Sequence, residues 1–354
     1  MLIEEACETM DRVRIGFIGV GGMGQCAHLK NYVAVPECEV TAIAELRPGL
    51  REAVGRKYGI ARTYPSGGEM LEREKFDGLV VCQMFDRHGQ IVIPLYRHGI
   101  PIFTEKPLAA SVEVGERMLR ALKAGGSWHM VGYHKRSDPA ILYAKAEIDR
   151  LKQTGELGKL RYVRLTMPAG DWVQGGFDDL IKTEEKVPDS PRDVEENWSS
   201  PHLQFVNYYI HQINLLRHLL GEPYRVTFAD KAGTLLVAES ASGLSGIIEM
   251  NPYLTSRDWQ ESALVCFEKG WIKVELPAPL VANRAGDVTV FRDPGNGVAP
   301  QTIRPVMPTI HAMKQQAIHF VRSIRGEVKP PCEAEEALED LCVAREYMRL
   351  RGNA

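Results

Sequence analysis

The chain has 354 residues, of which 44% are hydrophobic and 25% charged, and its formal net charge is −3 at pH 7. This length exceeds what one hydrophobic core comfortably organises, and it predicts two domains. The slightly acidic balance excludes the strongly basic face of a nucleic-acid-binding protein, and no apolar run is long enough to span a bilayer. We therefore expect no nucleic-acid and no membrane partner.

An apolar run at residues 13–18 predicts a buried first strand, and a glycine-rich segment follows it directly. This segment fits the dinucleotide-binding fingerprint, and residues 25–32 are expected to continue as a helix. The first glycine allows a tight turn, the second lets a pyrophosphate approach the backbone, and the third lets helix and strand pack closely. Free amides at the helix N-terminus favour the phosphates. The expected cofactor-binding residues here are Gly19, Gly21, Gly22, Met23 and Gly24.

A second strand is predicted at residues 39–44, and it ends in Glu45. An acid about 20 residues past the fingerprint accepts hydrogen bonds from the ribose hydroxyls of NAD and repels the 2′-phosphate of NADP. Arg47 leaves the other possibility open, because a guanidinium could hold that phosphate. The sequence favours NAD over NADP.

The rest of the first third alternates strands with helices. Strands are predicted at 79–82, 101–104 and 128–132, and helices at 50–58, 90–98 and 112–124. Such alternation predicts a parallel sheet covered on both faces, with ligands bound beyond the carboxyl ends of the strands. The residues expected to converge on that crevice are Glu45, Gln83, Lys106 and Tyr133. We assign residues 1–133 to this dinucleotide-binding domain.

The second half carries strands that follow one another with few helices between them. They are predicted at 160–166, 225–229, 246–249, 263–267, 271–275 and 287–291. This order favours antiparallel pairing and an α+β domain with a large open, mostly antiparallel sheet over residues 134–354. Two helices, at 311–325 and 334–350, close the chain, and packing of the last one back on the first domain is the alternative to a place within the second domain alone. The expected fold class is α/β, a Rossmann sheet plus this second domain.

One helix is predicted between Ser200-Pro201, a good start, and Gly221, a good stop. Asn207 and His211 lie four residues apart, and such a pair can point together at a ligand. The alternative for His211 is an ordinary core histidine.

The stretch from residue 171 to 200 holds nine acids against three bases, with Trp172, Phe177 and Trp198 among them. Aromatic faces beside carboxylates suit a polyol, whereas a solvated insertion or a subunit contact is the alternative. Lys135 and Arg136 could offset this acidity or bind an anion, so the charge of the substrate stays open at this point.

Seven scattered cysteines without a CxxC pair predict reduced packing residues and no metal site. The N-terminus lacks a positive segment followed by an apolar core, so it is a poor signal peptide. We expect a cytoplasmic protein.

These residues together resemble the Gfo/Idh/MocA oxidoreductase family. The resemblance is carried by residues 15–24, 77–81 leading to His88, Glu105-Lys106-Pro107, 132–139, 155–158 and 207–211. It implies a Rossmann domain followed by an open-sheet domain that often mediates assembly, hence a homo-oligomer (dimer or tetramer) through the C-terminal sheet. It also implies hydride exchange between a nicotinamide cofactor and a hydroxyl carbon, usually of a sugar or cyclitol.

Carried over to this chain, the resemblance implies that Lys106 donates to the reacting oxygen and that His211 takes the hydroxyl proton. It implies that the cofactor is bordered by Gln83, His88, Glu105 and Lys106, in addition to Glu45 and Arg47. It implies that the substrate is bound by Lys106, Tyr133, Lys135, Trp172, Asn207 and His211.

Two departures from the family pattern stand out. The helix usually carries Asp four residues before the histidine, whereas this chain has Asn207, which can orient a hydroxyl but cannot accept its proton. Gln83-Met84-Phe85 replaces a frequent Thr-Pro-Asn. We expect an NAD-dependent dehydrogenase acting on a sugar, a sugar derivative or an inositol. The alternatives are a redox-neutral glycoside-cleaving enzyme that oxidises its substrate transiently, and a non-catalytic NAD(H)-binding sensor.

Overall fold

The computed structural model describes residues 12–188, 190–195 and 200–352. Its first half is a six-stranded parallel sheet in the order β3-β2-β1-β4-β5-β6. The strands are β1 (Val13–Ile18), β2 (Cys38–Ala44), β3 (Thr63–Tyr64), β4 (Gly78–Val81), β5 (Ile102–Glu105) and β6 (His129–Gly132). The strand order reverses between β1 and β4, and in open α/β sheets this reversal is where ligands bind. The expected Rossmann-type sheet is confirmed.

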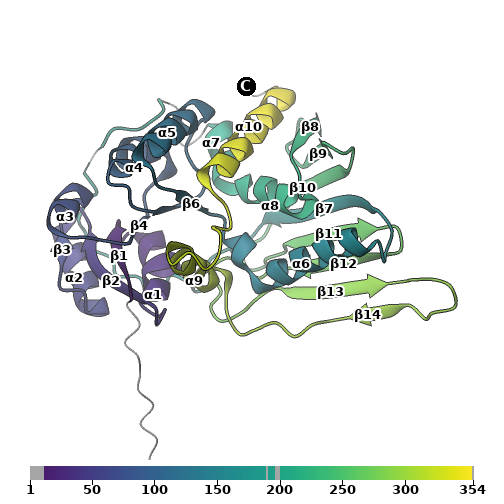
Figure 1. The fold of residues 1–354 in the computed structure, drawn as a ribbon. Coiled ribbons are helices and arrows are strands. Elements are labelled where there is room, and N and C mark those ends of the chain that lie inside the picture. Colours follow the sequence, from purple (N-terminus) through teal and green to yellow (C-terminus); the bar gives the residue numbers. More distant parts are fainter. Residues whose placement is uncertain (1–11, 189, 196–199, 353–354) are drawn as a thin grey trace, which may run out of the picture.

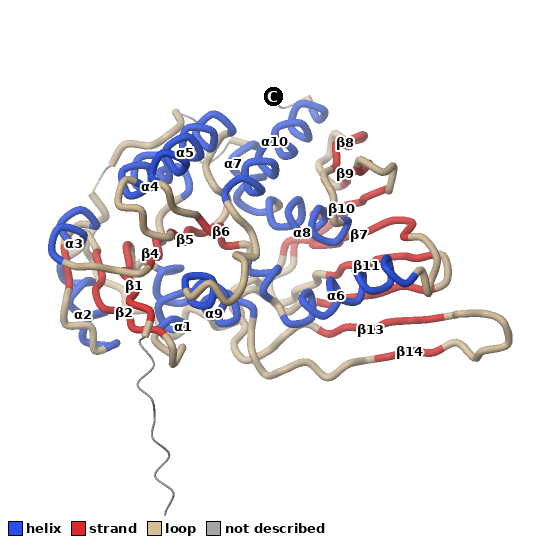
Figure 2. Tube along the Cα trace, viewed as in Figure 1, coloured by secondary structure: helices blue, strands red, loops and turns tan. Residues whose placement is uncertain are grey.

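Helices cover both faces of this sheet (Figures 1 and 2). Between β1 and β6 they are a π-helical turn (Gly24–Leu29) continued by α1 (Lys30–Tyr32), α2 (Pro48–Tyr58), α3 (Gly67–Arg73), a 3-10 turn (Phe85–Arg87), α4 (His88–Tyr96) and α5 (Val112–Gly125). Strand residues such as Ile15, Val80 and Phe103 are fully buried, as a doubly covered parallel sheet requires. The sequence did not predict β3 or α3, which are both short.

The second half is an eight-stranded sheet in the order β14-β13-β12-β11-β7-β10-β9-β8. Only β7 and β10 pair in parallel, and every other pair is antiparallel, so the predicted mostly antiparallel sheet is confirmed. The strands are β7 (Leu160–Ala169), β8 (Tyr224–Ala229), β9 (Leu235–Ser240), β10 (Ser245–Leu254), β11 (Ser262–Phe267), β12 (Gly270–Glu275), β13 (Asp287–Arg292) and β14 (Gln301–Ile303).

One face of this sheet is buried beneath α6 (Pro139–Thr154) and α8 (Ile210–Leu220), which pack on β12 and β13 and on β7 and β10. A 3-10 turn (His134–Ser137) leads from β6 into α6. The sequence missed α6, β9 and β14. In α6 the usual signals were present, since Asp138 accepts from the Ala140 amide at the N-cap and Gly155 ends the helix in the left-handed conformation.

The chain then returns to the first sheet through α9 (Ala312–Ile324) and α10 (Ala334–Arg351), the yellow end of the ribbon in Figure 1. The Phe320 ring lies 5.5–6.3 Å from the rings of Tyr32, Phe103 and Trp128. Beside β6, the Val131 amide donates to the carbonyl of Cys332 at 3.0 Å, and Met130 forms a bridge with Glu333. The C-terminal segment therefore completes the core and the edge of the nucleotide-binding sheet.

The prediction of one helix across residues 201–220 is wrong. The structure has α7 (Pro201–Tyr208) and α8, separated by Tyr209 with φ −90° and ψ −2°. Aromatic packing fixes this break, because the Tyr209 ring contacts those of Phe205 and Tyr208, and Phe205 stacks on Tyr347. Tertiary contacts thus override the helical pattern, and Asn207 and His211 lie on different helices.

Candidate functional site

The glycine-rich segment after β1, residues 19–24, forms an open turn that is called the glycine cradle below. A Cβ atom at Gly19 would lie 2.3 Å from the Cys82 carbonyl oxygen, and one at Gly24 would lie 2.3 Å from the Gly19 oxygen, so both positions need glycine. Gly19 also has φ +94°, which other residues rarely adopt. At Gly21 the nearest atom to such a Cβ is an Arg47 nitrogen at 3.6 Å, so the backbone there is accessible. This shape fits the pyrophosphate of a dinucleotide.

Glu45 lies between the cradle and Arg47. Its Oε2 accepts from the Val20 amide at 3.2 Å, and its Oε1 accepts from the Arg47 Nε at 2.8 Å. The carboxylate is therefore in place at the end of β2, as the NAD fingerprint requires. The guanidinium is already paired with this carboxylate.

Gln83 and His88 lie next to the cradle on the β4 side. The Gln83 amide nitrogen reaches the Gly19 turn, at 2.4 Å from where a Cβ would lie. His88 is fully buried, and its ring nitrogens face the carbonyl oxygens of Leu108 at 3.0 Å and Gln83 at 3.2 Å. Burial lowers the pKa of His88, so the ring is neutral and donates to one of these carbonyls. His88 therefore supports the backbone at Gln83 through its contact with the Gln83 carbonyl.

Lys106 directly follows β5. The residue before it, Glu105, forms a buried pair with His28. The Nε2 atom of His28 lies 2.7 Å from the Glu105 Oε1, and the Lys106 amide donates to the other carboxylate oxygen at 3.2 Å. Burial alone would raise the pKa of Glu105, but His28 and Lys106 more than offset this, so the pKa is lowered and the carboxylate stays charged. Sequence analysis missed His28, although it lies four residues after Gly24 in the turn that follows the cradle.

The Lys106 Nζ donates to the carbonyl oxygen of Asn207 at 2.6 Å. In an uninterrupted helix that oxygen would accept from the amide of residue 211, so the helix break leaves it to the lysine. Burial lowers the pKa of Lys106, the Glu105 carboxylate opposes this effect, and the charge of Lys135 adds to it. The two predicted residues Lys106 and Asn207 are thus brought together, through the asparagine backbone.

His211 lies at the start of α8, near enough to Lys106 for the lysine charge to influence it. Its ring centroid is 4.7 Å from that of His134 and 6.1 Å from that of Tyr133, which is itself buried. Its Nδ1 is buried and has no hydrogen-bond partner among the described residues. Burial lowers the pKa of His211 well below its usual value, and the charges of Lys106, His134 and Lys135 lower it further. The imidazole is therefore neutral and able to accept a proton.

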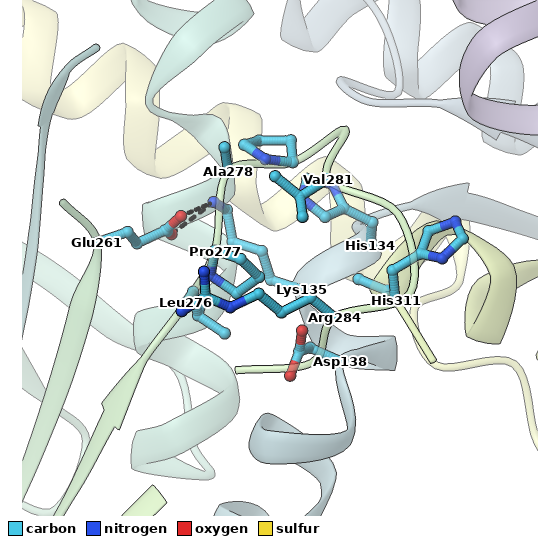
Figure 3. A pocket seen from close by; sticks show the side chains of 12 residues that line it. His134, Lys135, Asp138, Glu261, Leu276, Pro277, Ala278, Val281, Arg284 and His311 are labelled. Atoms are coloured by element: carbon cyan, nitrogen blue, oxygen red, sulfur yellow. Dashed lines mark hydrogen bonds and ion pairs between the residues drawn. The ribbon is translucent and has the colours of Figure 1, made fainter. Parts of the chain in front are cut away.

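The cations expected near the crevice are both paired. Lys135 forms a buried ion pair with Glu261, drawn as dashed lines in Figure 3, and Gln212 donates to the same carboxylate at 2.7 Å. Arg136 is bound by Glu336 and by the side-chain oxygen of Asn214. Neither cation offers an uncompensated charge.

The described part of the acidic stretch, residues 171–188 and 190–195, is called the acidic segment below, and it contacts the nucleotide-binding half. The Trp172 and Phe177 rings meet at 5.6 Å in a small cluster with Met23 and Met313, and Phe177 comes within 3.9 Å of a Cβ placed on Gly22. Ile181 exchanges two backbone hydrogen bonds with the side chain of Gln25, at 3.0 and 3.1 Å. The segment thus borders the cradle. Trp198 lies outside the described residues.

Within the described ranges, no helix has the length and apolar character needed to cross a bilayer. Over the same residues, no three histidine, cysteine, aspartate or glutamate side chains gather as metal ligands.

Comparison with known proteins agrees with this geometry. Residues 13–133 match the model of the Gfo/Idh/MocA family, described as an oxidoreductase family with an NAD-binding Rossmann fold. The chain is 27% identical to the scyllo-inositol 2-dehydrogenase (NAD(+)) of Bacillus subtilis over 253 residues, 67% of each chain. It is 24% identical to the myo-inositol 2-dehydrogenase of Thermotoga maritima over 234 residues, covering 64% of this chain and 60% of that enzyme. An oxidoreductase domain protein from Kribbella flavida shares the fold, with a TM-score of 0.75 at 20% identity, over 97% of this chain and 98% of that one. Residues 13–133 therefore form an NAD-binding Rossmann domain of the Gfo/Idh/MocA oxidoreductase type.

Proposed function

We propose that the protein is an NAD-dependent dehydrogenase that oxidises a secondary hydroxyl of a neutral polyol, an inositol or a sugar. The observation that carries this proposal is the bond from Lys106, which follows β5 at the same sheet edge as the glycine cradle after β1, to the backbone of Asn207, four residues before His211. The inositol dehydrogenases among the relatives support the substrate class. When bound, the nicotinamide accepts the hydride that leaves the hydroxyl carbon.

Lys106 stabilises the oxygen of the reacting hydroxyl as negative charge develops on it. Its Nζ has three donors, of which one is used by the Asn207 carbonyl, so the others are available to a substrate oxygen. The short bond to Asn207 directs the ammonium group, and Glu105 keeps the strand end in place. Such a preorganised donor acts where charge appears and needs no rearrangement during the reaction.

His211 is the proton acceptor in this proposal. It has an unpaired Nδ1 and a lowered pKa, so it is free of a proton at neutral pH and can remove one from the hydroxyl. Lys106 and His211 therefore divide the work, since the first stabilises the oxygen and the second takes its proton. The exposed side chain of Asn207 is suited to orient a substrate hydroxyl and cannot act as a base.

The substrate in this proposal carries no charge. Binding a carboxylate or phosphate in a partly buried site requires an uncompensated cation, yet Lys135 is neutralised by Glu261 and Arg136 by Glu336. The acidic segment beside the cradle adds further negative charge. Hydroxyl groups can bond both to the lysine and to its carboxylate partner, so the Lys135–Glu261 pair supports polyol binding.

The test is the appearance of reduced nicotinamide absorbance when the protein meets NAD and a panel of inositols, free sugars, aryl glycosides and a uronic acid, followed by product analysis. NADH that accumulates with one neutral polyol and yields its ketone supports the proposal. Aglycone release with no net NADH would instead mean redox-neutral glycoside cleavage. Tight NAD binding without any turnover, unaltered by Lys106→Met, would mean a sensor. A strong preference for the uronic acid would contradict the neutral substrate.

We further propose that the protein forms a homo-oligomer through its second sheet. The face of that sheet opposite α6 carries the stacked rings of Trp271 and Phe291, 5.7 Å apart and partly exposed. Light scattering that shows a monomer at micromolar concentration would contradict this assembly.

A further inference from the structure

One carboxylate of the acidic segment, that of Glu185, binds backbone amides of the nucleotide-binding half. Glu185 accepts hydrogen bonds from the backbone amides of Gly49 and Leu50, both at 2.9 Å, and from the Thr183 hydroxyl at 3.0 Å. Gly49 permits this approach, because a Cβ atom there would lie only 3.0 Å from a carboxylate oxygen of Glu185. Hydrogen bonding to the Gly49 amide lowers the pKa of Glu185, so the side chain is charged. The protein thus supplies its own anion, the Glu185 carboxylate, to these two amides.

The two amides belong to the first turn of α2, where Pro48 takes the first helical position and Arg47 the N-cap. Amides in a first turn have no partner within the helix, and together with the helix dipole they bind anions such as phosphates. This turn begins three residues after Glu45, the residue that meets the adenosine ribose in the fingerprint. An NADP cofactor carries its extra phosphate on that ribose, where an arginine and free amides would receive it.

Glu45 alone is a weak barrier to that phosphate. Its charge is compensated by Arg47, with which it shares a 2.8 Å hydrogen bond, so the pair is neutral as a whole. Glu185 lies close to Arg47, and the positive charge of Arg47 lowers the pKa of Glu185 further. The three groups together carry a net negative charge, and the amides that would solvate a phosphate are already occupied.

We propose that Glu185 is a cofactor-specificity residue, which fills the anion site at the start of α2 with its own carboxylate and so excludes the 2′-phosphate of NADP. The inference rests on the proposed nicotinamide cofactor and deepens it. Selection against NADP is then made by a residue of the 171–195 segment, 140 positions after the strand end that normally decides it (185 minus 45).

The rest of the segment stays attached when Glu185 is changed. Lys57 donates to the carbonyl of Asp179 at 2.7 Å, and Gln25 holds Ile181 by two hydrogen bonds. Replacing Glu185 therefore vacates the amides without releasing the segment. Glu184 is exposed and has the same charge, so Glu184→Gln is a matched control.

The experiment measures dissociation constants of NADH and NADPH by nucleotide fluorescence for the wild type, Glu185→Ala, Glu185→Gln and Glu184→Gln. We expect the wild type to prefer NADH, and Glu185→Ala to bind NADPH about tenfold more tightly than the wild type while NADH changes less than about threefold. Glu185→Gln should gain less, because its amide oxygen still occupies the site, and Glu184→Gln should match the wild type.

Unchanged NADPH binding by Glu185→Ala, with NADH bound normally, would overturn this inference and leave the proposed function standing. An equal gain in Glu184→Gln would also overturn it, because general charge would then explain the effect. A wild type that binds neither nucleotide would overturn the proposed function, and this inference with it.

Discussion

Replacing His28 with leucine should expose how strongly the cofactor turn is coupled to the catalytic strand. His28 is 1% exposed and the Glu105 side chain 12%, and their 2.7 Å contact spans 77 residues of sequence. Leucine fills much of the same space but leaves one carboxylate oxygen without a partner. Breaking a buried charged pair on one side costs roughly 3–5 kcal/mol. The amide of Lys106 still serves the other oxygen, so we expect a loss of about 2–3 kcal/mol in unfolding free energy.

The coupling is best measured as a cycle with Glu105→Gln. Glutamine keeps a hydrogen bond to His28 without the charge, so this single change should cost about 1 kcal/mol. In the double variant, His28→Leu no longer leaves a buried charge without a partner. The loss of unfolding free energy that it adds to Glu105→Gln should therefore be smaller than in the wild type, by a coupling energy of about 1–3 kcal/mol. Urea denaturation followed by tryptophan fluorescence, at fixed neutral pH, provides the four free energies.

The same variant has a consequence for chemistry. Without His28, the pKa of Glu105 should rise, because burial is then opposed by Lys106 alone, and the carboxylate should support the charge of Lys106 less. Turnover at neutral pH should fall in His28→Leu while the affinity for NADH changes little. Effects on stability that add within about 0.5 kcal/mol in the double variant would refute the coupling.

Three further predictions concern single side chains. Lys106→Met should lower the turnover number by roughly 10²–10³-fold with little change in NADH affinity, as steady-state kinetics and fluorescence titration would show. Because His211 is neutral through its lowered pKa, hydroxyl oxidation should slow as the pH falls through that pKa, and a rate profile of His211→Gln with the same acid limb would contradict its role. Burial lowers the pKa of His129 to about 3, so below about pH 6.5 only the unfolded chain takes up its proton. Unfolding free energy should then drop by about 2 kcal/mol from this group between about pH 7 and pH 5, and urea midpoints of His129→Gln should depend less on pH.

Local pattern was enough to predict most of the first sheet and the glycine turn that follows β1. The glycines, the strand before them and the acid at 45 have fixed spacings, because one βαβ unit sets them. The second sheet was also predictable, since alternating burial along β11 and β12 is visible in their sequences. These features depend on neighbours in the chain.

Features set by distant contacts were not predictable. The break at Tyr209 comes from rings on α7 and α10, and no glycine or proline marks it in the sequence. The pairing of Lys135 with Glu261 joins residues 126 positions apart, and the sequence left open whether this lysine offsets the nearby acidity or binds an anion. The attachment of Glu185 to α2 is of the same kind. In each case the partner is chosen by the fold, and composition alone cannot name it.

The return of the C-terminal helices means that the nucleotide-binding half is not a separable module. A chain truncated after residue 133 would lose Phe320 from the rings of Tyr32, Phe103 and Trp128, and would uncover the edge of β6 that Cys332 and Glu333 now protect. An open parallel edge beside an exposed aromatic patch invites pairing between chains. Such a fragment should aggregate when it is expressed alone, and fusing residues 311–352 back to it through a linker should restore a folded, monodisperse product.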